Sequence, residues 1–326
     1  MILNPDESQR LKFIRTIAVW LIIITHISKE YEMNLGQWTN TGVQVFLVIS
    51  GFLSGQKEIY NWNDWFRCRF RRLIPSYYTI LIITAVGYWF FLHINIVDTR
   101  FIAHFSTIHF LLFPGCPIWG GHLWYITAIV VCYCIFPFLY RTKEMYFPYF
   151  LFFIFVAVPF ALILVCYKYK AVIPYRLSAD IYSFIAGFAI AKIFATKPAG
   201  YLTPLSIFMS FLLIALKETA ILNNYWNQLF IKELIFVIAP WIKFSLGISI
   251  FFLFYSPVFN KLSYINIVNF IDKYSYEIYL SHKNFILGPL SLLHMTQIRS
   301  FNIVIALFLS ITLAVFIQKI TIKIVR

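Results

Sequence analysis

The chain has 326 residues, of which 61% are hydrophobic and only 12% are charged. Soluble domains carry about 25% charged residues, so this composition cannot supply the polar shell of a water-soluble protein of this length. The formal net charge of +14 comes from Lys and Arg that stand in short clusters between apolar blocks. That placement is typical of membrane topology and of anionic ligands, and it argues against a nucleic-acid-binding protein.

The apolar blocks are about 17 to 24 residues long, near the length that crosses a bilayer core as a helix. Because lipid cannot satisfy exposed backbone polar groups, we expect an all-α, polytopic integral membrane bundle of about ten transmembrane helices. No small-residue cleavage site follows the first apolar block, so we interpret it as an uncleaved helix rather than a signal peptide. The expected spans are residues 11–28, 41–57, 73–92, 121–140, 147–166, 178–195, 202–216, 232–255, 274–294 and 300–320.

The placement of Lys and Arg predicts the orientation of these spans. The cations are most frequent in the segments that lie inside when the N-terminus is cytoplasmic, so we expect both termini in the cytoplasm. The longest loop, 93–120, is then external and contains His93, His104 and His109. Their spacing matches no familiar metal motif, so a lid or re-entrant loop is favoured over a metal site. We expect a single membrane-embedded domain over residues 1–326 without a soluble appendage.

The first span carries two polar residues, Arg15 and His26. Eleven residues at about 100° each place both side chains on one face of a helix, about 16 Å apart along its axis. Polar groups at such depths usually face a cavity or a partner. A snorkelling arginine with a structural histidine remains an alternative to a functional pair. Glu30, one turn beyond His26, would accept a hydrogen bond from the imidazole and fix its tautomer, with Glu32 as a second candidate.

Small residues mark the second span. Ser50-Gly51 and Ser54-Gly55 predict a close helix–helix approach, which is the default explanation of such pairs in a membrane. Gln44 would lie near the outer end of this span, at a level similar to that of His26.

A dense arginine cluster precedes Pro75, and its members are Arg67, Arg69, Arg71 and Arg72. Arginine is the preferred fork for phosphate, which favours a phosphate-rich ligand at the inner surface. Topogenic charge with anionic-lipid contact is the alternative. Together with His26, the cluster suggests an anionic donor that docks at the arginines while the histidine acts as a general base on a hydroxyl.

At this point the chain resembles the membrane-bound acyltransferase-3 family of bacterial O-acyltransferases. The matching stretches, in the family's order and spacing, are IRTIAVWLIIITH, GVQVFLVISGFL, RFRRLIPSYY, GHLWYITAIVVCYCIFPFLY and SYEIYLSHKNFI. The resemblance implies a multi-pass protein of the bacterial inner membrane that moves an acetyl or other acyl group from cytoplasmic acyl-CoA to a hydroxyl of a cell-surface polysaccharide or lipid-linked sugar. It implies acetyl-CoA as donor, no metal, and as partners the glycan acceptor, membrane lipids and other polysaccharide-biosynthesis proteins.

The resemblance also implies roles for individual residues. The Arg-X10-His pattern falls on Arg15 and His26, and the Arg-X-X-Arg pattern on Arg69 and Arg72. His26 would be the catalytic base with Glu30 beside it. The CoA phosphates would bind Arg15, Arg69, Arg71 and Arg72, and the acceptor site would be formed by His122, Trp124, Tyr125, Tyr279 and His282.

Two mechanisms and two rival functions stay open. His26 would deprotonate the acceptor for direct attack on the thioester, or it would first form an acyl-imidazole. Many family members carry acids where this chain has Gln44 and the Thr127–Ile129 stretch, and some carry an additional extracytoplasmic hydrolase-like domain that we do not expect here. The rivals are a glycan or lipid-linked sugar carrier without chemistry and a purely structural membrane subunit.

Overall fold

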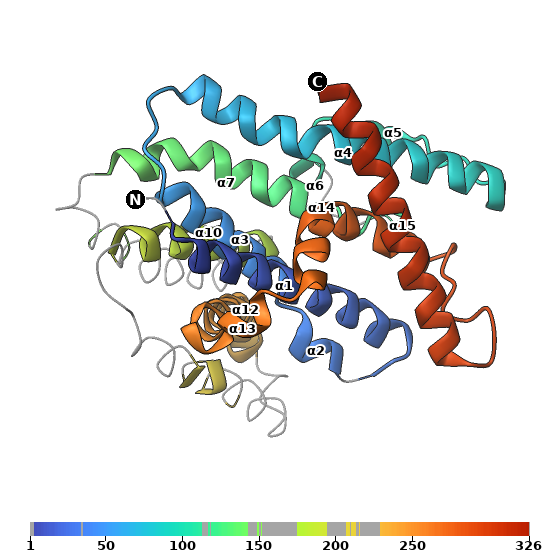
Figure 1. Cartoon of the computed structure of the whole chain (residues 1–326). Helices are drawn as coiled ribbons and strands as arrows, with labels where there is room; N and C mark the ends of the chain where they lie inside the picture. Colours follow the sequence, from blue (N-terminus) through green and yellow to red (C-terminus); the bar gives the residue numbers. More distant parts are fainter. Residues whose placement is uncertain are drawn as a thin grey trace. The chain divides into compact units, whose positions relative to one another are not determined.

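The computed structural model describes residues 3–33, 35–112, 117, 119–142, 149, 151, 175–193, 207–208, 210–212, 215 and 229–325. In these residues the regular secondary structure is entirely helical, which confirms the all-α prediction (Figure 1). The helices are α1 (Pro5–Glu30), α2 (Leu35–Thr39), α3 (Gly42–Gly55), α4 (Trp62–Leu92), α5 (Thr99–His104), α6 (His109–Leu112), α7 (Trp124–Arg141), α10 (Tyr175–Ile193), α12 (Leu229–Tyr255), α13 (Asn260–Ser263), α14 (Asn266–Ile286) and α15 (Arg299–Val325).

Four helices among the described residues are long and apolar enough to cross a membrane, namely α1, α4, α7 and α15. A fifth span follows if the bent pair Trp241–Tyr255 and Pro257–Ser263, with 62° between its parts, is counted as one. The chain is therefore a multi-pass membrane protein. The span expected at 147–166 falls almost wholly, and that at 202–216 for the most part, outside the described residues, and a total of ten spans stays a prediction.

Helix α4 begins eleven residues before the span expected at 73–92. The Asn61 side chain caps it by accepting a hydrogen bond from the Asn63 backbone N–H, and Asp64 places negative charge in its first turn. Pro75 lies inside the helix and does not end it. Membrane helices tolerate proline because neighbouring helices and side chains can satisfy the backbone carbonyl that loses its N–H partner. The arginine cluster and the apolar span therefore belong to one continuous helix.

The chain divides into two compact units. The first unit comprises Met1–Arg10, Val43–Glu58 and Cys132–Phe259, and the second comprises Leu11–Gly42, Ile59–Val131 and Asn260–Arg326. Each predicted site residue belongs to the second unit.

In the first unit, α3 and α10 approach each other through glycines. A Cβ atom on Gly51 would collide with the backbone carbonyl of Phe184, and one on Gly187 would collide with that of Val48. The predicted packing role of the small residues in this span is confirmed. Beside this contact the buried Gln44 side chain donates to Asp180 Oδ1 over 2.9 Å, so α10 supplies an acid next to Gln44.

In the second unit, α14 lies against α4 and α15 (Figure 1). Its side chains also reach α1, where Asp272 pairs with Arg15. The α15 face toward α14 carries small, fully buried residues, Ala306, Ser310 and Ala314, at intervals of one helical turn. Ser281 Oγ donates to the Ser310 carbonyl over 2.8 Å. Small residues with interhelical hydrogen bonds are the usual means by which membrane helices pack closely.

Helix α14 also differs from the span expected at 274–294, since it begins at Asn266 and ends at Ile286. The polar residues near its start lower the local hydropathy, so the sequence did not indicate that the helix begins at Asn266. Residues 287–298 form a turn that leads to α15, in which Asn302 Nδ2 donates to the carbonyls of Leu293 and Thr296.

The glycine contact leads to a prediction about stability. Gly51→Ala should lower the free energy of unfolding by about 1–3 kcal/mol, because a backbone carbonyl cannot move aside as a flexible side chain can. Gly87→Ala is the matched control, since its Cβ would meet only Leu290 Cδ1 at 3.7 Å and alanine favours the helix. Thermal unfolding in detergent measures both variants. Equal melting temperatures would contradict the close approach of α3 and α10.

Candidate active site

Three histidines from distant parts of the chain meet in the second unit. They are His26 on α1, His122 just before α7, and His282 on α14. The ring centroids of His26 and His282 are 5.0 Å apart, and those of His122 and His282 are 5.4 Å apart. His122 and His282 are buried, whereas His26 is partly exposed. His282 therefore lies beside His26, although the two residues are far apart in the sequence.

Backbone carbonyls define the tautomers of the two buried histidines. His282 Nδ1 lies 2.6 Å from the Tyr279 carbonyl and 3.2 Å from that of Ile278, and His122 Nε2 lies 2.9 Å from that of Leu280. Since a carbonyl oxygen only accepts hydrogen bonds, both of these nitrogens must carry the proton. The other ring nitrogen of each histidine, Nε2 of His282 and Nδ1 of His122, then holds a lone pair.

The remaining ring nitrogens are unusual for buried groups. His122 Nδ1, His282 Nε2 and His26 Nδ1 are buried and have no hydrogen-bond partner within the described residues. Buried polar atoms are nearly always paired, so such atoms mark a place for water or a ligand. Two of the three are acceptors by the tautomer argument. The cluster is therefore suited to accept hydrogen bonds, or a proton, from a hydroxyl group.

Aromatic side chains adjoin the cluster. The Tyr279 hydroxyl donates to the His122 carbonyl, and the Tyr279 ring lies 5.1 Å from that of Tyr125 and 5.9 Å from that of His282. Tyr279 thus ties α14 to the segment that carries His122. Trp124, the first residue of α7, is partly exposed. Sugar stacking by Trp124 and Tyr125 stays a prediction.

Glu30 lies at the end of α1, one turn beyond His26. Its carboxylate is 3.4 Å from Nε2 of His294, which belongs to the turn between α14 and α15. The Tyr31 ring packs edge-on against the same histidine, and its hydroxyl donates to the Leu293 carbonyl. These contacts anchor the end of α1 to the turn. None of these contacts is the hydrogen bond that we expected between Glu30 and His26.

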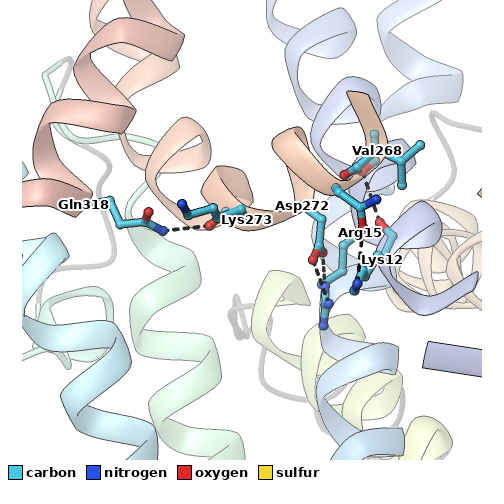
Figure 2. Close-up of polar contacts among 8 residues, drawn as sticks. Lys12, Arg15, Val268, Asp272, Lys273 and Gln318 are labelled. Atoms are coloured by element: carbon cyan, nitrogen blue, oxygen red, sulfur yellow. Dashed lines mark hydrogen bonds and ion pairs between the residues drawn. The ribbon is translucent and has the colours of Figure 1, made fainter. Parts of the chain in front are cut away.

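Arg15 forms an ion pair with Asp272 of α14. Arg15 Nε lies 2.5 Å from Oδ1 and Nη2 lies 3.1 Å from Oδ2, so the pair is bidentate, and both side chains are mostly buried. Figure 2 shows the guanidinium directed at the carboxylate, with Lys12 beside it. Asp272 was not among the predicted site residues. An acid next to a predicted span only weakly indicates a site, and no sequence pattern identifies Arg15 as the partner of Asp272.

The arginine cluster is divided by the faces of α4. Arg67 and Arg71 are exposed and lie one turn apart, on the same face as the exposed apolar Ile82 farther along the helix. Arg69 is partly exposed, with its guanidinium 5.3 Å from the Trp65 ring, and Arg72 is exposed and lies three residues farther along. At about 100° per residue, Arg69 and Arg72 lie on a different side of α4 from Arg67 and Arg71. The two pairs therefore present their charges in different directions.

A second acid was missed on α14. Glu277 is buried and accepts a hydrogen bond of 2.9 Å from Ser76 Oγ, one turn beyond Arg72 on α4. An acid inside a predicted span is the signal that could have found it, because such residues are costly in lipid and need a partner.

The segment between α4 and α7 contains a stacked histidine pair. The rings of His104 and His109 are 3.7 Å apart and nearly parallel, and Trp119 packs on His104. The Tyr77 hydroxyl donates to the His104 carbonyl over 3.1 Å and lies 3.4 Å from His109 Nδ1. Burial lowers the pKa of His109 to about 3, with His104 adding to the effect, and burial also lowers the pKa of His104. Across the part of the chain that the structure describes, no group of three or more His, Cys, Asp or Glu side chains could hold a metal ion.

Comparison with known proteins identifies the family. Residues 9–319 match the acyltransferase-3 family, described as an acyltransferase domain. This match covers nearly the whole chain, and the protein belongs to the acyltransferase-3 family. It is thus a multi-pass membrane acyltransferase. No curated protein and no solved structure matches the chain.

The histidine pair predicts a pH dependence of stability. The pKa of His109 is lower in the folded chain than the ordinary value of 6.5, so the unfolded state binds more protons between pH 6.5 and about 3. The contribution of His109 to the free energy of unfolding should be fully present above pH 6.5, and it should be lost progressively as the pH falls below that value. His109→Phe keeps a stacked ring that does not titrate, and its melting temperature should fall less between pH 7 and 5.

Melting curves in detergent at pH 5, 6, 7 and 8 test this dependence. Between pH 7 and 8 the melting temperatures of the wild type and of His109→Phe should change in parallel. In that range His109 is mostly neutral in both the folded and the unfolded state, and phenylalanine does not titrate. Parallel curves at all four values would show that His109 is free to take up a proton in the folded chain.

Proposed function

We propose that the protein transfers an acyl group, acetyl in the first instance, from cytoplasmic acyl-CoA to a hydroxyl of a cell-surface polysaccharide or lipid-linked sugar. The observation that carries the proposal is the cluster of His26, His122 and His282, with its unpaired buried nitrogens, in a member of an acyltransferase family. The chain would lie in the bacterial inner membrane with both termini in the cytoplasm, where acyl-CoA is available.

In this mechanism His26 is the general base. It is the one member of the cluster that is partly exposed, and so the one most open to a substrate. His26 removes the acceptor proton as the hydroxyl oxygen attacks the thioester carbonyl. The tetrahedral intermediate then collapses with cleavage of the C–S bond, and the imidazolium returns the proton to the leaving CoA sulfur. The products are the sugar ester and CoA. An acyl-imidazole on His26 is the covalent variant.

The buried histidines assist from fixed positions. The lone pairs of His122 Nδ1 and His282 Nε2 accept hydrogen bonds, from the acceptor hydroxyls or from His26. Trp124 and Tyr125 form the wall against which the sugar ring stacks, and Tyr279 holds His122 in place through its backbone carbonyl. Glu30 remains a candidate for orienting His26.

The donor's phosphates would bind at the inner arginines. Arg69 and Arg72 are the stronger candidates, because Arg69 is partly buried and Arg72 lies one turn before Ser76, which donates to Glu277 of α14. Arg71 and Arg67 share the outward face, which favours anionic lipid for that pair. Comparison of the two pairs tests both assignments.

Loss of the base should abolish transfer. His26→Ala should lower turnover by about 10²–10⁴-fold, the usual contribution of a general base, with little change in the KM for acyl-CoA. The measurement uses purified protein in nanodiscs, labelled acetyl-CoA and a panel of glycan acceptors, and follows both CoA release and the labelled product. A carrier without chemistry would make no acylated glycan with either protein, which would refute the proposal.

The arginine pairs should separate kinetically. The double variant Arg69→Gln/Arg72→Gln should raise the KM for acyl-CoA by about 10²–10⁴-fold, since each of the two lost hydrogen bonds between charged groups contributes about 1.5–3 kcal/mol. Arg67→Gln/Arg71→Gln makes the same change in net charge on the outward face of α4 and should leave this KM nearly unchanged. The same rise in both variants would mean that net charge, rather than a defined phosphate site, attracts the donor.

A further inference from the structure

Helices α1 and α14 run parallel and meet at two levels. At the first level Arg15 pairs with Asp272, and at the second His26 lies beside His282. Residue numbers rise in the same direction along both helices between these contacts. A shift of one helix along the other would therefore disturb both levels together.

The spacing of the two levels is nearly equal on the two helices. From Arg15 to His26 is eleven residues, or about 16.5 Å at 1.5 Å per residue, and from Asp272 to His282 is ten residues, or about 15 Å. The difference is about the rise of a single residue. Formation of the ion pair thus brings the two histidines to within about one residue's rise of each other along the helix axes.

The ion pair is built to resist sliding. Its two parallel N–H···O contacts fix the guanidinium in direction as well as in distance. On the opposite side of α14, Gln318 Nε2 of α15 donates to the Lys273 carbonyl over 2.8 Å. Figure 2 shows these contacts on the two sides of α14, which hold the helix between α1 and α15 at this level.

The same contacts bear on what Arg15 can bind. Two of its nitrogen atoms face the Asp272 carboxylate, which neutralises the charge that would attract a phosphate. A donor phosphate would have to displace a bidentate carboxylate whose side chain is itself mostly buried. Breaking such a pair leaves an uncompensated charge, which is strongly unfavourable.

We propose that Arg15 and Asp272 are positioning residues, and that their ion pair sets the axial register of α1 against α14 and thereby brings His26 to His282. Arg15 acts through Asp272 and is no ligand of the donor. The kinetic part of this proposal rests on the acyl transfer proposed above. A slip of one residue would displace one ring from the other by about 1.5 Å, and errors of about 1 Å in a catalytic arrangement can cost about 100-fold in rate.

Kinetics of single variants and a charge exchange test the proposal. Asp272→Asn and Arg15→Gln should each lower kcat by about 10–100-fold with little change in the KM for acyl-CoA. The double variant Arg15→Asp/Asp272→Arg rebuilds the pair in reverse and should recover most of kcat. A phosphate ligand at Arg15 predicts the opposite, because an aspartate there would repel the donor and raise KM further.

The matched control is Asn269→Ala. It removes the exposed 3.2 Å contact from Lys12 Nζ to Asn269 Oδ1, between the same helices and one turn from the ion pair. Its kcat should match that of the wild type. A loss as large as that of Asp272→Asn would show that any polar contact here matters equally, and it would overturn the assignment.

Cross-linking tests the register without catalysis. His26→Cys/His282→Cys is made in a background in which the five native cysteines are replaced, and a short thiol-specific cross-linker is applied in the full-length chain. The yield should fall severalfold when Asp272→Asn is added and return with the exchanged pair. Equal yields in all three backgrounds would refute the positioning role. If the wild type transfers no acyl group, the proposed function fails, and this cross-link alone decides the register.

Discussion

The second unit is organised around one polar helix whose side chains must find partners on its neighbours. In a membrane an unsatisfied polar group costs several kcal/mol, so each polar residue of α14 demands a complementary group. Glu277 accepts a hydrogen bond from the Ser76 hydroxyl of α4, and Asn284 donates one to Thr84 of α4. Ser281 donates to the Ser310 carbonyl of α15. These bonds, together with the ion pair to α1, specify where each neighbour lies along α14. The helix acts as a common reference for three others, and His282 lies among these contacts.

Backbone bonding has a second effect on the site. The protons of His122 and His282 are held by main-chain carbonyls, so the chemistry of both rings is decided by helix geometry rather than by other side chains. A substitution that moves these carbonyls relative to the rings would change which nitrogen of each ring carries the proton. The positions of both rings therefore depend on contacts far from the cluster, the ion pair of Asp272 with Arg15 among them.

The sequence predicted the residue types of the site better than their partners. His26, His122 and His282 could be named because a titratable group in an apolar span is rare and costly, and the structure brings the three together. Asp272 could not be named as the partner of Arg15, since an ion pair across 257 residues leaves no local pattern. The expected link from Glu30 to His26 followed from helical spacing alone, and spacing says nothing of His294, which meets Glu30 from another segment. The expected start of α4 was also wrong, because the helix is capped at Asn61 and continues through Pro75, so it begins well before its apolar part.

The pairing of α1 with α14 also bears on how the protein is made. Arg15 is synthesised before Asp272, from which 257 residues separate it. At about 5–20 residues per second, translation needs roughly 13–50 s to cover that distance. During this time the guanidinium must stay at the lipid headgroups or borrow a temporary counter-ion, because its permanent one does not yet exist. A nascent chain released before α14 therefore holds two of the three histidines, His26 and His122, and the cluster is complete only after α14 has been made.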